Sequence, residues 1–98
     1  MESFNGIIFD SHNPVFRSPQ GAVKRGETLT LCLFVSAALF PARVTVRIWQ
    51  KETEHLFSME KKGFFAHTPY GDCLHQFCLN VSCETIGVFW YQFLVETS

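Results

Sequence analysis

Hydrophobic and polar residues alternate along the segment from Glu27 to Val35, which predicts a β-strand with one face in the core. The predicted core side consists of Leu29, Leu31, Leu33 and Val35, and the opposite side consists of Thr28, Thr30, Cys32 and Phe34. Gly26 bounds the run at its start. After the run, Ser36–Phe40 is expected to form one helical turn before Pro41.

The same alternation returns from Arg43 to Lys51, followed by a polar turn and a shorter strand. The predicted core side consists of Val44, Val46 and Ile48, and the outward side consists of Arg43, Thr45, Arg47 and Trp49. The turn is Gln50–Thr53, and the next strand, Glu54–Glu60, is expected to bury Phe57 and Met59. Two such runs joined by a short polar turn predict a β-hairpin.

The front and the middle of the chain carry shorter patterns. Gly6–Phe9 predicts a short strand, His12–Gly21 a loop, and Phe64–Ala66 a short edge strand. The strongest turn signal is Thr68–Asp72, because proline fixes one φ angle and glycine allows a positive one. Cys73–Ser82 then predicts a strand whose core side consists of Phe77, Leu79 and Val81.

The last strand-like run, Gly87–Glu96, is the most aromatic part of the chain, and Glu84–Gly87 is expected to turn into it. One predicted face consists of Phe89, Tyr91, Phe93 and Val95, and the outward face consists of Trp90, Gln92, Leu94 and Glu96. The run stops two residues before the chain does. This predicts one module of a longer protein.

Together these elements predict an all-β protein. About seven short strands with turn signals at regular intervals, in a chain of 98 residues, are typical of an immunoglobulin-like antiparallel β-sandwich. A chain of this length forms one domain, and we assign residues 1–98 to it. Hydrophobic residues make up 47% of the chain, which excludes disorder.

Charge and hydropathy exclude two classes of partner. The net charge is −1, and the densest basic segments are the doublets Lys24–Arg25 and Lys61–Lys62, so we expect no nucleic-acid partner. No stretch approaches the roughly 20 apolar residues that span a bilayer, so we expect no membrane association. The first residues lack the basic start and apolar run of a signal peptide, which favours a cytoplasmic protein.

Four cysteines raise the question of a metal site. They are Cys32, Cys73, Cys78 and Cys83, and their spacing differs from the tight pairs of structural zinc sites. Although His67 and His75 lie nearby in the sequence, we expect half-buried free thiols. We therefore predict no metal and no other cofactor.

One segment resembles a known family. Phe16–Val23, with the sequence Phe-Arg-Ser-Pro-Gln-Gly-Ala-Val, is similar to an element near the start of N-terminal domains of α-amylase-superfamily glycoside hydrolases, of the amylase, neopullulanase and pullulanase type. The resemblance continues through Gly26 and the leucine-rich strand after it, the strand Val44–Trp49, and the final Gly87–Phe93. It thus covers the chain from about His12 to Glu96.

The resemblance implies a domain that precedes a catalytic (β/α)8 barrel in the same parent chain. It also implies binding of starch-like α-glucans, packing beside the active-site cleft, or dimerisation, without selecting among them. The catalytic motifs of the barrel are absent from this sequence, and its carboxylates are scattered, so we predict no catalytic residues and no enzyme activity in this chain.

The outward aromatic residues form the candidate carbohydrate site, because sugar rings stack on exposed aromatic faces. The candidate residues are Trp49, Trp90, Tyr70, Arg47 and Gln92. Two alternatives remain open: both tryptophans are buried against the barrel, or they belong to the edge of the core. Phe34 favours docking, and Arg17 is expected to pin its loop.

Three functions therefore remain open from the sequence. The first is a non-catalytic domain that packs on the barrel and binds α-glucan. The second is a purely structural or dimerisation domain, and the third is an unrelated sandwich interaction module. We also expect some self-association of the isolated domain through its exposed apolar residues.

Overall fold

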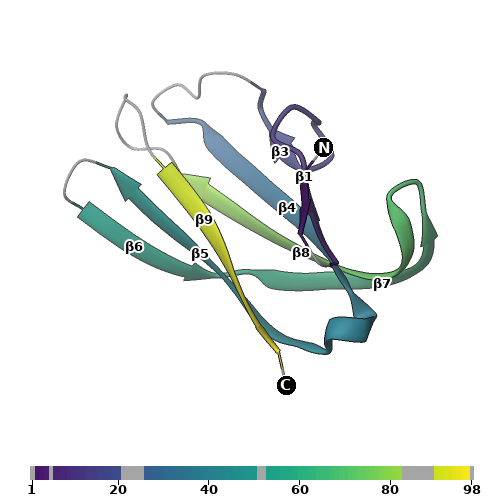
Figure 1. Cartoon of the computed structure of the whole chain (residues 1–98). Coiled ribbons are helices and arrows are strands. Elements are labelled where there is room, and N and C mark those ends of the chain that lie inside the picture. The colour runs from purple at the N-terminus through teal and green to yellow at the C-terminus, as the bar shows by residue number, and fades with distance from the viewer. Residues whose placement is uncertain (1, 5, 21–25, 51–52, 83–89, 98) are drawn as a thin grey trace.

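The computed structural model describes residues 2–4, 6–20, 26–50, 53–82 and 90–97. These residues form two antiparallel β-sheets packed face to face, with one 3-10 turn (Figure 1). The prediction of an all-β, immunoglobulin-like sandwich is therefore confirmed. Nine strands lie in the described part of the chain, and three of them contain only two or three residues.

The larger sheet, sheet A, has the strand order β1-β2-β4-β8-β7, and β3 also pairs with β4. Its strands are β1 (Glu2–Phe4), β2 (Ile7–Phe9), β3 (Arg17–Ser18), β4 (Thr28–Ser36), β7 (Glu60–Thr68) and β8 (Gly71–Ser82). The smaller sheet, sheet B, has the order β6-β5-β9. Its strands are β5 (Pro41–Gln50), β6 (Thr53–Ser58) and β9 (Trp90–Thr97).

The core lies between the sheets and follows the period-two patterns of the sequence. The predicted core residues of β4 are fully buried, as are Val44 and Val46 of β5, and Ile48 is nearly so. From β9, Tyr91, Phe93 and Val95 pack against this cluster. Phe9 of β2 joins the two sheets, because its ring centroid lies 4.7 Å from that of Phe93. These predictions are confirmed.

The outer face of β4 is covered, which contradicts the outward placement of Phe34. This residue is only 6% exposed. Its ring lies against Phe16, at 5.7 Å between centroids, and is stacked on Tyr70 at the same distance. The alternation correctly places Phe34 on the face opposite the core, but the loop before β3 folds back over that face. Phe34 is therefore buried within this domain.

Contacts within the similarity segment fix the chain at β3 and just after it. Phe16 is fully buried. Arg17 donates from Nη1 to the backbone oxygen of Pro19 at 2.8 Å, and Gln20 donates from Nε2 to the backbone oxygen of Arg17. The Ser18–Pro19 peptide bond is cis. Arg17 thus pins its loop, as expected, while residues 21–23 of the segment lie outside the described part.

The chain passes from sheet B to sheet A at Met59, between β6 and β7. Met59 is buried as expected, and its amide donates to Val44 of β5. Phe57, in contrast, is 37% exposed, which contradicts its predicted burial. Phe57 is paired with the buried Val46 and so points to the inner side of sheet B, but β6 is the edge strand of that sheet among the described strands, where burial is incomplete (Figure 1).

The turns agree with the sequence where they are described. Residues 69–70 form the turn between β7 and β8, within the Thr68–Asp72 signal. The predicted helical turn is the 3-10 turn η1 (Ala37–Leu39), and the Ser36 hydroxyl accepts a hydrogen bond from the Ala38 amide at its start. The expected edge strand at Phe64–Ala66 is longer than predicted, since β7 has nine residues. The turn predicted at Glu84–Gly87 and Phe89 lie outside the described residues.

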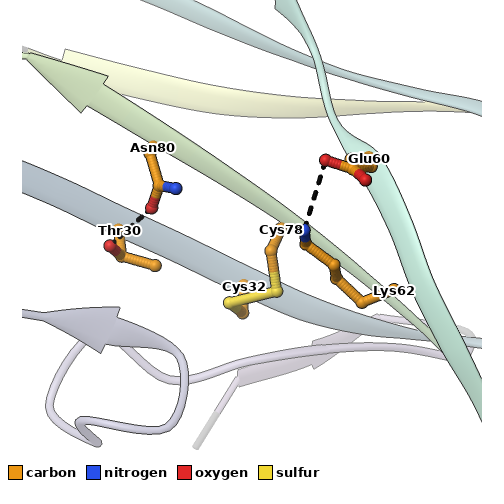
Figure 2. The surroundings of a disulfide bond; sticks show 6 residues. All are labelled: Thr30, Cys32, Glu60, Lys62, Cys78 and Asn80. Atoms are coloured by element: carbon orange, nitrogen blue, oxygen red, sulfur yellow. Dashed lines mark hydrogen bonds and ion pairs between the residues drawn. A yellow bond between two sulfur atoms is a disulfide. The ribbon is translucent and has the colours of Figure 1, made fainter.

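Cys32 and Cys78 form a disulfide, which contradicts the expectation of free thiols for these two residues. Cys73 is free and exposed, and Cys83 lies outside the described residues. Cys32 of β4 and Cys78 of β8 are cross-strand partners with their Cα atoms 4.1 Å apart (Figure 2). The Cys32 amide donates to Phe16 on the other side of β4. The pair is therefore a non-hydrogen-bonded one, in which the side chains approach closely. Sequence spacing does not show this register, because the two residues are 46 positions apart.

Candidate functional site

The outer face of sheet B brings four of the five candidate site residues together. In the pairing of β5 with β9, Trp49 is the direct partner of Trp90, and Arg47 is the direct partner of Gln92. Direct partners in an antiparallel sheet point to the same face and have Cβ atoms about 4.5–5.5 Å apart. The four side chains therefore form two adjacent rows on one surface, which we call the sheet B face.

Strand β6 extends these rows on the other side of β5. Glu54 is paired with Trp49, and Leu56 with Arg47. The sequence analysis did not assign either residue to the site. The turn at Gln50–Thr53 contained the necessary signal, because closing the hairpin there places Glu54 opposite Trp49.

The apolar residues of the sheet B face differ in exposure. Trp90 is 63% exposed, Leu56 61% and Leu94 39%. Trp49 is half-buried and thus less exposed than Trp90, although the two residues are direct cross-strand partners. Trp90 is therefore the aromatic ring that a partner molecule meets first on this face.

Arg47 is held by two neighbours at the centre of the face. Its Nε lies 2.7 Å from Oε1 of Glu54, and its Nη2 donates to Oε2 of the same carboxylate at 3.3 Å. Its guanidinium carbon also lies 5.2 Å from the centre of the Trp49 ring, a cation–π contact. The Nε atom of Arg47 is buried, and its contact with Glu54 is an ion pair and not a hydrogen bond. The guanidinium is thus oriented by a carboxylate and a ring together.

A second ion pair lies on the same face further along β5 and β9. Arg43 Nε is 3.4 Å from Oε2 of Glu96, and both side chains are largely exposed. The two arginines and the two glutamates of the face therefore pair with each other. A surface whose positive and negative charges are paired has little long-range attraction for ions. Stacking and hydrogen bonding are therefore the interactions by which this face can recognise a partner.

Tyr70, the fifth candidate residue, lies in a turn that joins two strands of sheet A and not on the sheet B face. It is in the β7–β8 turn, where its ring stacks on Phe34 and its hydroxyl accepts a hydrogen bond from Asn13 Nδ2 at 3.1 Å. Tyr70 therefore holds the loop before β3 against sheet A, and the structure does not bring it near either tryptophan.

The chemistry available on the sheet B face is recognition. The indole of Trp90 offers an exposed apolar surface, and the neighbouring amide of Gln92 can donate and accept hydrogen bonds. Exposed aromatic rings with adjacent polar groups are the composition that binding surfaces favour. Glu54 and Glu96 are each engaged by an arginine on this face.

One histidine outside this face has a shifted pKa. Burial, and then the positive charge of Lys61, lower the pKa of His75 below its usual value. Its Nδ1 is buried without a hydrogen-bond partner, and its ring lies 5.2 Å from that of Phe64. This environment favours the neutral imidazole.

The described residues contain no group of three or more histidine, cysteine or acidic side chains that could hold a metal ion. Within the same part of the chain, no helix has the length and hydropathy needed to cross a membrane. Comparison with known proteins finds no matching family model, no matching curated protein and no matching solved structure.

Proposed function

We propose that this chain is a non-catalytic domain of an α-glucan-degrading glycoside hydrolase of the α-amylase superfamily. In this proposal the sheet B face packs against the catalytic barrel of the same parent chain. The resemblance of the sequence around Phe16–Val23 supports the family. The observation that carries the proposal is the exposure of Trp90, 63%, on a face whose charges are already paired.

Interdomain packing suits this surface for a physical reason. Contacts between domains resemble transient protein–protein interfaces, which bury aromatic residues at their centre and keep polar residues at their rim. Trp90, Leu94 and Leu56 supply the apolar part, and the two ion pairs lie beside them. Pairing within the domain lets the charges approach a partner without leaving an unpaired buried ion.

Binding of starch-like α-glucan is the second candidate, and the pairing of Trp90 with Gln92 on one face favours it. The ring can stack on a glucose unit while the amide contacts its hydroxyl groups. A domain that holds the polysaccharide raises the local concentration of substrate near the barrel. The chain itself supplies no catalytic step in this proposal.

The sequence of the gene that encodes this chain tests the family part of the proposal. We expect the reading frame that encodes this chain to continue into a (β/α)8 barrel with a nucleophilic carboxylate and an acid. A reading frame that contains no such barrel would contradict the proposal and would favour an unrelated interaction module.

The glucan part is tested by calorimetric titration of the 98-residue chain with maltoheptaose and β-cyclodextrin. We expect saturable binding that Trp90→Ala abolishes and that Phe64→Ala leaves unchanged. Phe64 is the matched control, because it is an aromatic residue 52% exposed on sheet A. No heat of binding at millimolar sugar would reject this candidate and would leave barrel packing as the role of the face.

A dimerisation domain remains the alternative, and the same face predicts its behaviour. If copies associate through Trp90, Leu94 and Leu56, the average mass in sedimentation experiments rises with protein concentration. In that case, Trp90→Lys lowers the average mass to that of the monomer. A chain that stays monomeric at high concentration rejects dimerisation through this surface.

A further inference from the structure

We propose that Arg47 and Glu54 form a latch that covers Trp49, and that opening this latch turns a one-tryptophan surface into a two-tryptophan surface. For its ligand, this inference rests on the glucan binding proposed above. The covering of Trp49 does not depend on that proposal. The latch makes Glu54 a positioning residue that acts through Arg47.

The observation behind the latch is the unequal exposure of two neighbouring rings. Trp49 and Trp90 are direct cross-strand partners, so both side chains leave the same face of sheet B. Trp90 is nevertheless 63% exposed while Trp49 is half-buried. Arg47, two residues before Trp49 on the same face, lies over the Trp49 ring at 5.2 Å.

Glu54 determines where the guanidinium lies. It comes from β6, directly opposite Trp49 and diagonal to Arg47. Its two carboxylate oxygens contact two different nitrogens of Arg47, at 2.7 and 3.3 Å. One contact is a hydrogen bond and the other is an ion pair, and together they hold the guanidinium beside the carboxylate. The carboxylate therefore keeps Arg47 over the ring.

The latch has a consequence for sugar binding. A glucose unit stacks on an aromatic face only if that face is free, and the guanidinium occupies the face of Trp49. The closed surface therefore offers Trp90 alone. Because exposed ion pairs and cation–π contacts are each weak, a ligand that reaches both rings can displace Arg47, at a cost in affinity.

Acrylamide quenching tests the latch without any ligand. The chain has two tryptophans, so Trp90→Phe leaves Trp49 as its only indole. In this background, we expect Glu54→Ala and Arg47→Ala each to increase the quenching of Trp49. The matched control is Glu96→Ala, which breaks the other ion pair of the same face and is expected to leave Trp49 quenching unchanged. Circular dichroism and thermal unfolding verify that each variant is folded.

Each result of this test decides the inference. Increased quenching in both latch variants, with no change in the control, supports the latch. Equal quenching in all folded variants would overturn it, because Trp49 would then be shielded by something else. An increase in Arg47→Ala alone would show that Glu54 does not position the arginine, which also overturns the latch as stated.

A sugar-binding measurement distinguishes failure of the latch from failure of the proposed function. With both tryptophans present, we expect Glu54→Ala to bind maltoheptaose about threefold to tenfold more tightly than the wild-type chain, since the ligand no longer breaks the latch. Unchanged or weaker affinity of a variant whose Trp49 is exposed would overturn the role of Trp49 as a second contact. Absence of binding in both proteins would reject glucan recognition, while the quenching result would still decide the latch.

Discussion

Phe16 holds the loop before β3 onto sheet A. It is fully buried, and its ring meets those of Phe9, Phe34 and Tyr70 in edge-on contacts with centroids 4.9–6.1 Å apart. Edge-on pairs add to the free energy gained from burying each ring. The residue thus joins the core between the sheets to the aromatic cluster on the outer face of sheet A.

Truncation of Phe16 is expected to be costly. We predict that Phe16→Ala lowers the free energy of unfolding by about 3–5 kcal/mol, because it leaves a cavity among three aromatic rings. Urea denaturation measures this loss. The control is Phe64→Ala on an exposed position of β7, which is expected to change the free energy by no more than about 0.5 kcal/mol. Equal losses in the two variants would contradict the packing described for Phe16.

The lowered pKa of His75 predicts how the stability of the fold depends on pH. Its pKa is lowered in the folded chain, first by burial and then by Lys61, so the unfolded chain takes up a proton before the folded chain does. The contribution of His75 to stability is complete above about pH 6.5 and is lost as the pH falls through the folded pKa. Thermal unfolding between pH 7 and pH 5 should therefore show a smaller decrease for His75→Gln than for the wild-type chain. The same decrease in both would exclude His75 as the cause.

The residue scale also shows where the sequence is informative. Alternation correctly predicts which side of β4, β5 and β9 each side chain takes, because that depends only on the strand geometry. It does not predict what covers a face. Phe34 was expected to be an outward docking residue for this reason, and Tyr70 was expected near the tryptophans although it stacks on Phe34.

At the scale of elements, the disulfide links the two central strands of sheet A. Cys32 and Cys78 lie in the middle of the β4–β8 pairing, and the Thr30–Asn80 hydrogen bond and the Glu60–Lys62 ion pair lie beside them (Figure 2). Disulfides persist in oxidising compartments. The sequence favours a cytoplasmic protein, and the location of this chain stays a prediction.

Loss of this bond is expected to weaken sheet A. We predict that the double variant Cys32→Ala/Cys78→Ala loses about 2–4 kcal/mol of unfolding free energy, because the unfolded chain gains the freedom of a long open loop. A reductant should destabilise the wild-type chain similarly and leave the double variant unchanged. Cys73→Ala, at an exposed free cysteine, is the control. A wild-type chain insensitive to reductant would contradict the bond.

Strands β6 and β7 show why some elements could not be predicted. Residues 60–68 lack a period of two, and Gly63 lies at a register shift between β7 and β8, so only a short edge strand was expected there. The sequence predicts Phe57 in the core because it lies two positions before Met59 and therefore on the same face of a strand. Whether a strand is covered depends on the opposite sheet, and the sequence of β6 does not contain that information.

At the scale of the whole molecule, the two sheets have different outer surfaces. The outer face of sheet A carries the aromatic cluster around Phe16 and Phe34, at whose edge Phe65 is 42% exposed, whereas the outer face of sheet B presents Trp90, Leu56 and Leu94. Charges on the sheet B face are paired within the domain. An exposed tryptophan beside paired charges is why we propose that sheet B carries the function. The sequence places four of the candidate residues on this face because they alternate on two strands.

Mapping of maltoheptaose binding by NMR chemical shifts tests most directly whether the sheet B face is a recognition surface for α-glucan, since a chain of 98 residues gives resolved spectra. We predict that the sugar shifts the indole N–H of Trp90 and the side-chain amide of Gln92, together with backbone amides of β5 and β9. Amides of β4, β7 and β8 are expected to remain unchanged. Shifts that gather on sheet A, or no shifts at millimolar sugar, would contradict glucan binding by the sheet B face.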